Sequence, residues 1–85
     1  MMQPLDLIRT AQQLADGLDS AGLGIWERNA SLILGDVVDG NEARLAEDLL
    51  EVIADLRSVE NRTDGGASWR ADADRLEAQI ARVLR

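Results

Sequence analysis

Carboxylates are the side chains that could do chemistry in this chain, because most other catalytic residue types are absent. The 85 residues include 16 Asp and Glu but no His, Cys or Tyr, and all nine cationic side chains are Arg. Without His there is no proton shuttle near neutral pH, and without Cys there is no thiolate nucleophile or thiolate metal site. General acid or base catalysis would therefore depend on Asp and Glu alone.

Two pairs of carboxylates have a spacing that suits a metal ion. Asp48 with Glu51, and Asp74 with Glu77, each form a D-x-x-E pair on a predicted helix, so both acids of a pair lie on one side of that helix. Mg²⁺ accepts carboxylate oxygens and can present a pyrophosphate group for hydrolysis. If any residues hold a metal ion, we expect them to be Glu51, Asp55 and Glu77.

This arrangement resembles the all-α nucleotide pyrophosphohydrolases of the MazG kind, whose motif pairs glutamates and an aspartate on adjacent helices. The resemblance implies a Mg-dependent hydrolase of nucleotides. Asp48 and Asp74 stand where that family carries Glu. The simpler interpretation is that these acids form a solvated helix surface, with no catalytic residue, no metal and no cofactor.

A positive tip is the second candidate site. It consists of Arg57, Arg62, Trp69 and Arg70 beside a glycine-rich turn, in a chain whose net charge is −7. Because Trp and Arg are enriched at binding hot spots, we predict that the positive tip binds a partner. The alternative for Trp69, as for Trp26, is a place in the core.

Length and composition favour one small domain spanning residues 1–85. Hydrophobic residues make up 46% of the chain, and its two aromatic residues are both Trp, so the core must be aliphatic. A chain of this size buries roughly 60 to 65% of its unfolded surface, which predicts marginal stability or an oligomer. The chain shows no signal peptide and no segment of membrane length, so we expect a cytoplasmic protein that does not contact a membrane.

Hydrophobic periodicity predicts four helices, over about 4–20, 25–38, 41–61 and 68–85. We expect Gly17, and then Gly22 and Gly24, to weaken and end the first helix, and Asp39 and Gly40 to end the second. The third helix begins either with Asn41 as its cap or with a capping box that starts two residues earlier.

The last two helices carry apolar stripes whose steps alternate between four and three residues. Around a turn centred on Asp64 and Gly65 the stripes match layer by layer, which predicts an antiparallel, coiled-coil-like hairpin. Their members are Leu45, Leu49, Val52, Leu56 and Val59, then Trp69, Ala73, Leu76, Ile80 and Val83. The predicted fold class is therefore all-α, a four-helix bundle-like domain in which the first two helices cover one flank of this hairpin.

Heptad positions indicate which flank of the hairpin is free. The flank expected to be covered is mostly apolar and brings Glu60 opposite Arg70. The other, called the acidic flank, contains Asp48, Asp55 and Asp72. We expect Asp55 to lie opposite Asp72 there. Water and salt make the repulsion between two exposed carboxylates small, and a cation or a basic partner would neutralise it.

The sequence as a whole predicts a non-catalytic function. The apolar face of the third helix is too broad for one neighbour, so we expect this helix to be the central one of the domain. We expect a small acidic module that binds another protein and forms a homodimer, because the chain is small and this apolar surface is wide. The net negative charge disfavours direct binding to nucleic acid. An alternative is an inhibitor that mimics nucleic-acid phosphates, as anti-defence proteins can, and it would require acids at regular spacing on one exposed face. The Mg-dependent hydrolase is a second alternative.

Overall fold

A computed structural model describes residues 4–63 and 66–84, with side chains for 5–60 and 66–84. Every regular element in these ranges is helical. The helices are α1 (Pro4–Asp16), α2 (Asp19–Asp39), α3 (Glu42–Thr63) and α4 (Gly66–Val83). The prediction of an all-α, four-helix domain is confirmed, and the packing of the helices is that of a bundle.

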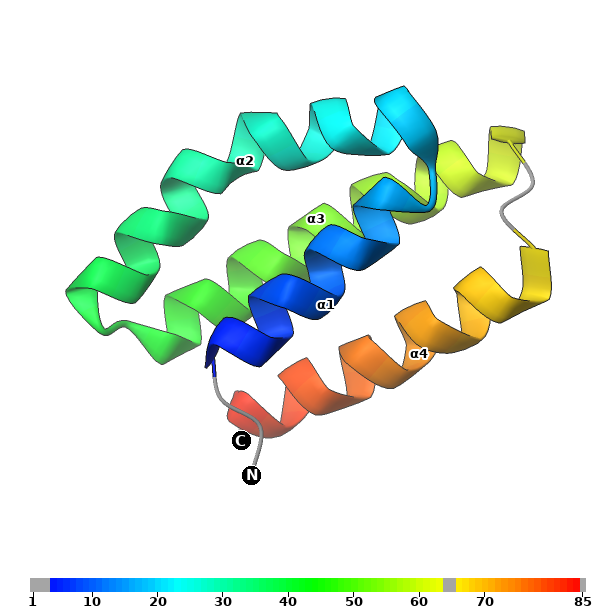
Figure 1. Ribbon diagram of the computed structural model, residues 1–85. Coiled ribbons are helices and arrows are strands. Elements are labelled where there is room, and N and C mark those ends of the chain that lie inside the picture. Colours follow the sequence, from blue (N-terminus) through cyan, green and yellow to red (C-terminus); the bar gives the residue numbers. More distant parts are fainter. Residues whose placement is uncertain (1–3, 64–65, 85) are drawn as a thin grey trace.

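The helices are arranged around a central pair. α1 lies across α3, with α2 along one side of this pair and α4 along the other (Figure 1). Within the described ranges α2 and α4 do not contact each other. The molecule therefore has two outer helices that are held independently by the same central pair.

The core is aliphatic, as predicted, and α3 contributes the largest share of it. The buried side chains of this helix are Leu45, Ala46, Leu49, Val52, Ile53, Leu56 and Glu60. Three helices contact α3, so its broad apolar face is covered within one copy of the chain. The expectation that the third helix is central to the domain is therefore confirmed, and the breadth of its apolar face does not by itself require a second copy.

The first boundary differs most from the prediction. α1 ends at Asp16 and α2 begins at Asp19, so the reversal occurs earlier than expected. The Leu18 backbone N–H donates to the Ala15 carbonyl at 3.0 Å, and Asp19 has a left-handed φ of 58°, which Asp tolerates better than most residues. Of the three glycines predicted to end α1, Gly17 directly follows its last residue, whereas the prediction is wrong for Gly22 and Gly24, which lie inside α2.

Gly22 has a packing role instead of a terminating one. A Cβ atom at this position would lie 2.1 Å from the Ala15 carbonyl oxygen, far inside van der Waals contact. The missing side chain therefore lets α2 pass close to the backbone of α1. Gly24 has open space around it, so no such contact requires a glycine there.

The boundary between α2 and α3 agrees with the prediction. Gly40 has a left-handed φ of 68°, and its N–H donates to the Val37 carbonyl at 3.1 Å. The Asn41 side chain accepts a bond from the Arg44 N–H at 3.1 Å, so Asn41 is the cap of α3. Of the two predicted starts for the third helix, the cap is confirmed and the capping box is not observed.

The boundary between α3 and α4 differs from the prediction by two residues on each side. α3 continues to Thr63 and α4 begins at Gly66, two residues beyond and two before the predicted limits. The predicted centre of the turn, Asp64 and Gly65, lies outside the described residues.

The acidic flank is partly covered by the first two helices. Asp72 and Gln79 of α4 line one hollow together with residues of α1, and Asp48 of α3 lies within reach of a hydrogen bond to Asp36 of α2. The prediction that α1 and α2 leave this side open is therefore wrong at Asp48, whereas the Asp72 side chain stays 51% exposed beside the hollow. Asp55 is exposed. α1 packs against both α2 and α4, whereas α2 packs against α3 without reaching α4 in the described ranges (Figure 1).

Candidate functional site

Trp69 belongs to the core and not to an exposed anchor. Trp69 is 7% exposed, and its indole Nε1–H donates to the Leu14 carbonyl of α1 at 2.9 Å. A buried indole needs such an acceptor, so this bond ties the start of α4 to the end of α1. The interpretation of Trp69 as a core residue is confirmed.

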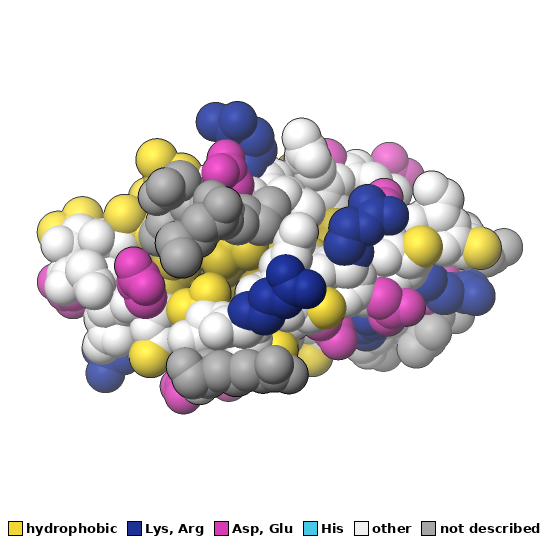
Figure 2. Space-filling model, turned by 90° about the horizontal axis from the view of Figure 1, so that it is seen from below, with side chains coloured by type: hydrophobic (Ala, Val, Ile, Leu, Met, Phe, Trp, Pro, Cys, Tyr) yellow, Lys and Arg dark blue, Asp and Glu magenta, His cyan; other side chains and the backbone are white. Residues whose placement is uncertain are grey.

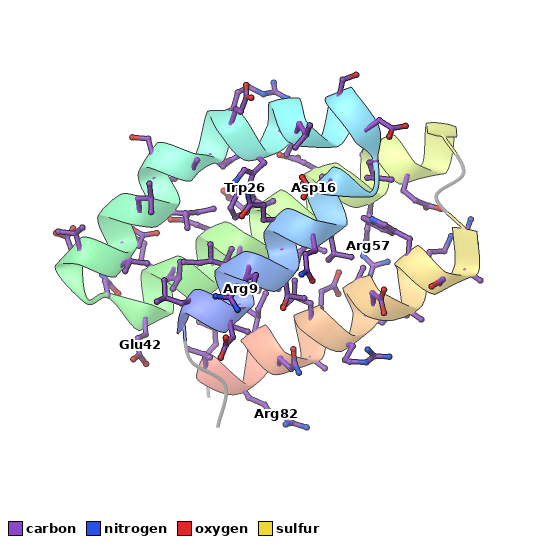
Figure 3. All side chains as sticks on the ribbon, in the orientation of Figure 1. Arg9, Asp16, Trp26, Glu42, Arg57 and Arg82 are labelled. Atoms are coloured by element: carbon purple, nitrogen blue, oxygen red, sulfur yellow. The ribbon has the colours of Figure 1, made fainter. Side chains whose placement is uncertain are left out.

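Arg57 lies between α3 and α4 and is bound by two acids of α4 (Figure 3). Its Nε–H donates to Glu77 at 2.6 Å, and its Nη2 donates to Asp74 at 2.5 Å. The hydrogen bond to Glu77, followed by the one to Asp74, raises the pKa of Arg57 further above its usual value. The guanidinium is therefore fixed in a bridge between the helices.

Arg70 makes the opposite connection, from α4 to α3. Its Nε–H donates to Glu60 at 2.9 Å, which confirms the predicted pairing of these residues. The Glu60 side chain is 2% exposed, whereas that of Arg70 is 54% exposed. Arg70 therefore supplies charge compensation for a carboxylate that would otherwise be buried alone.

The four residues of the positive tip do not form a free positive surface with an aromatic anchor. Trp69 is buried, Arg57 and Arg70 are engaged with acids, and the side chain of Arg62 lies outside the described residues. Figure 2 shows the side of α4, where acidic and basic side chains are interleaved rather than gathered by sign.

The D-x-x-E pairs do not converge on a metal site. Asp74 and Glu77 both accept bonds from Arg57, and Asp48 lies within reach of a hydrogen bond to Asp36. In the described part of the chain, no three acids lie close enough together to hold a metal ion, which includes the candidate set Glu51, Asp55 and Glu77. An arginine thus occupies the place where one pair would need a cation.

Asp36 and Asp48 form a carboxyl pair that the sequence did not lead us to expect. An aspartate is expected on the solvent side of a helix, but Asp36 is 3% exposed. It continues the spacing of Ile25, Asn29 and Ile33, and this periodicity was the signal that could have placed it inside. Burial, followed by the hydrogen bond to Asp36, raises the pKa of Asp48 to about 6.

A shallow hollow lies between α1 and α4. Its volume is about 450 Å³, and its apolar floor includes Leu14, Trp69 and Leu76. Polar side chains surround this floor, among them Asp72 and Arg75, whose charged atoms are 3.5 Å apart. The indole N–H in its floor is already bonded, so the hollow offers no buried polar group to a ligand.

The outer face of α2 is the largest run of exposed apolar side chains on one helix. This face comprises Leu23, Trp26, Ala30, Leu34, Val37 and Val38, which recur at helical spacing. Leu34 is 59% exposed and Val38 is 85% exposed, whereas Trp26 and Val37 pack partly against the core. Trp26 lies between α2 and α1, so the face extends to the edge of α1 (Figure 3).

No protein-family model matches this chain, and no curated protein or solved structure is significantly similar to it. Within the described residues, no helix is both long and apolar enough to cross a membrane.

Proposed function

We propose that the chain is a non-catalytic, cytoplasmic module that binds protein, and that its partner is a second copy of itself. The supporting observation is the outer face of α2, where Leu34 and Val38 expose most of their surface. A two-fold pairing needs a surface that matches itself, and an apolar stripe at heptad spacing meets this requirement.

Charge supports the choice of this face. The chain carries a net charge of −7, so two copies repel each other over most orientations. Between residues 23 and 38 the charged side chains are Glu27, Arg28 and Asp36, and Asp36 is buried. The exposed charges of this segment therefore cancel, and two copies can approach through it without a large electrostatic cost.

The finer arrangement of the last two helices is also part of the proposal. We propose that α3 and α4 form the antiparallel, coiled-coil-like hairpin expected from their stripes. Arg57 pairs with Glu77 and Asp74, whereas the later Glu60 pairs with the earlier Arg70. Residue numbers thus rise along α3 as they fall along α4, which supports the antiparallel hairpin. The outer face of α2 is not part of this hairpin and is left for a partner.

Sedimentation velocity at micromolar concentration tests self-association. We expect the native chain to sediment as a dimer of twice its 9.3 kDa mass, and we expect Leu34→Glu to sediment as a monomer. Leu32→Glu is the matched control, because Leu32 is 50% exposed on the same helix but points away from the stripe. This variant should remain dimeric. A native chain that sediments as a monomer over the whole concentration range would contradict the proposal.

Mimicry of nucleic acid is a second candidate, favoured by one observation on α3. Glu47, Glu51 and Asp55 are exposed and four residues apart, so they follow one another at a rise of about 6 Å along the helix. Inhibition of DNA cleavage by restriction endonucleases would test it. Neutralising all three acids should then abolish inhibition, whereas the exposed Asp74→Asn on α4 should not. A native chain without inhibitory effect would rule this candidate out.

A further inference from the structure

The Asp36–Asp48 pair lies where α2 packs on α3, with Asp36 buried and Asp48 partly buried. Asp36 is 3% exposed, and the Oδ2 atoms of both residues are buried with no hydrogen-bond partner. The two carboxyl groups lie within reach of a hydrogen bond to each other. Two carboxylates have acceptors only, so this bond exists only while one of them carries a proton.

Nearby charges do not replace that proton. Asp36 from α2 and Glu51 from α3 both disfavour the ionised form of Asp48, whereas Arg44 from α3 favours it. The effect of Arg44 is the smallest of these, and burial has the largest effect. Asp36 thus differs from Glu60, which is just as buried but has a guanidinium 2.9 Å away.

We propose that the Asp36–Asp48 pair makes the packing of α2 on α3 depend on pH, tight when one proton is shared and weakened when both carboxyls are ionised. The protonated pair contributes a hydrogen bond across the helix contact. The doubly ionised pair places two negative charges in a poorly solvated contact, where their repulsion is strong. The backbone of Asp36 also accepts the Asn41 N–H at 3.0 Å, so the strain acts at the turn that connects α2 to α3.

The direction of the pH dependence follows from the raised pKa of Asp48. The value is about 6 in the folded chain and 3.8 for an ordinary Asp. The folded state therefore holds its proton more tightly than the unfolded state does. The stabilisation is complete below the unfolded value and is lost as the pH rises through about 6.

Thermal unfolding between about pH 4.5 and 7.5 tests the proposal. We expect the melting temperature of the native chain to fall by about 5 °C or more over this range. Asp48→Asn should remove most of the fall, because an amide donates a hydrogen bond to Asp36 at every pH. Asp55→Asn removes an exposed acid from the same helix and should keep the native slope, which controls for the general change in net charge.

A measurement on the native chain keeps the proposal testable if a variant does not fold. Carboxyl ¹³C resonances followed by NMR should show one Asp that titrates near pH 6 and is assigned to Asp48. Amide exchange, corrected for the intrinsic effect of pH, should increase more in α2 than in α4 above that midpoint. An Asp48 that titrates near its ordinary value, or equal slopes for the native chain and Asp48→Asn, would overturn the proposal.

Discussion

The two outer helices are attached to the same central pair by opposite means. α4 is joined by groups of complementary character, which are the Arg57 and Arg70 ion pairs and the hydrogen bond from Trp69. α2 is joined by a close backbone approach at Gly22 and by two carboxyls that face each other. Its outer side also exposes apolar surface.

This difference indicates which helix is adapted to respond. On the α4 side each buried polar group named above has a partner. We therefore expect the contacts of α4 in the native chain to respond little to changes in pH. α2, which ends at the turn at Gly40, carries both an unpartnered carboxylate oxygen and exposed leucines. We therefore expect assembly and the pH response of the native chain to depend on α2, and the contacts of α4 to contribute to its stability.

The largest effect is expected when the close approach of α2 to α1 is blocked. Gly22→Ala would place a Cβ 2.1 Å from a backbone oxygen that cannot move aside, and we expect a loss of about 3 kcal/mol in the free energy of unfolding measured in urea. Gly24→Ala is the matched control. It meets open space within the same helix and should stabilise the chain by up to about 1 kcal/mol. Equal effects of the two substitutions would show that the contact is not tight.

Removing the counterion of Glu60 should have the next largest effect. Arg70→Ala leaves a carboxylate that is 2% exposed without its guanidinium, and we expect a loss of about 2 kcal/mol at neutral pH. Lowering the pH should restore part of this loss, because the abandoned carboxylate can then be protonated. Arg75→Ala breaks an exposed pair on the same helix and should change the free energy by less than about 0.5 kcal/mol. If both variants lose the same free energy of unfolding, the Glu60 carboxylate does not depend on Arg70 for charge compensation.

The smallest effect is expected at the bridge between α3 and α4. Arg57→Ala removes two ion pairs whose acids are substantially exposed, 73% for Asp74 and 39% for Glu77, so water screens the loss. We expect about 1 kcal/mol or less in low salt, decreasing as salt is added. Urea unfolding at two salt concentrations measures it. A large loss that does not respond to salt would mean that Arg57 acts through packing of its aliphatic stem.

The parts of the structure that depend on local periodicity could be predicted from the sequence. The stripes predicted helices over most of α3 and α4, and heptad positions predicted the pair of Glu60 with Arg70. The Gly40 and Asn41 boundary was also predictable, because both residues act on their own helix ends.

The parts that depend on contacts between helices could not be predicted in this way. Glycine often ends a helix, and only the position of the Ala15 carbonyl shows that Gly22 serves packing instead. Asp36 has a spacing that fits the inner side of α2, but its type argued for solvent. The same ambiguity affects Trp69, whose acceptor on α1 is distant in sequence.

The close approach at Gly22 also has a consequence for recognising relatives of this chain. A distant homologue with the same crossing of α1 and α2 must keep glycine at this position, because even a methyl group separates the helices. Glycines 24 and 35, by contrast, are free to vary, since both face open space. One invariant glycine followed by two variable ones is therefore the fingerprint by which such homologues could be found when overall similarity has been lost.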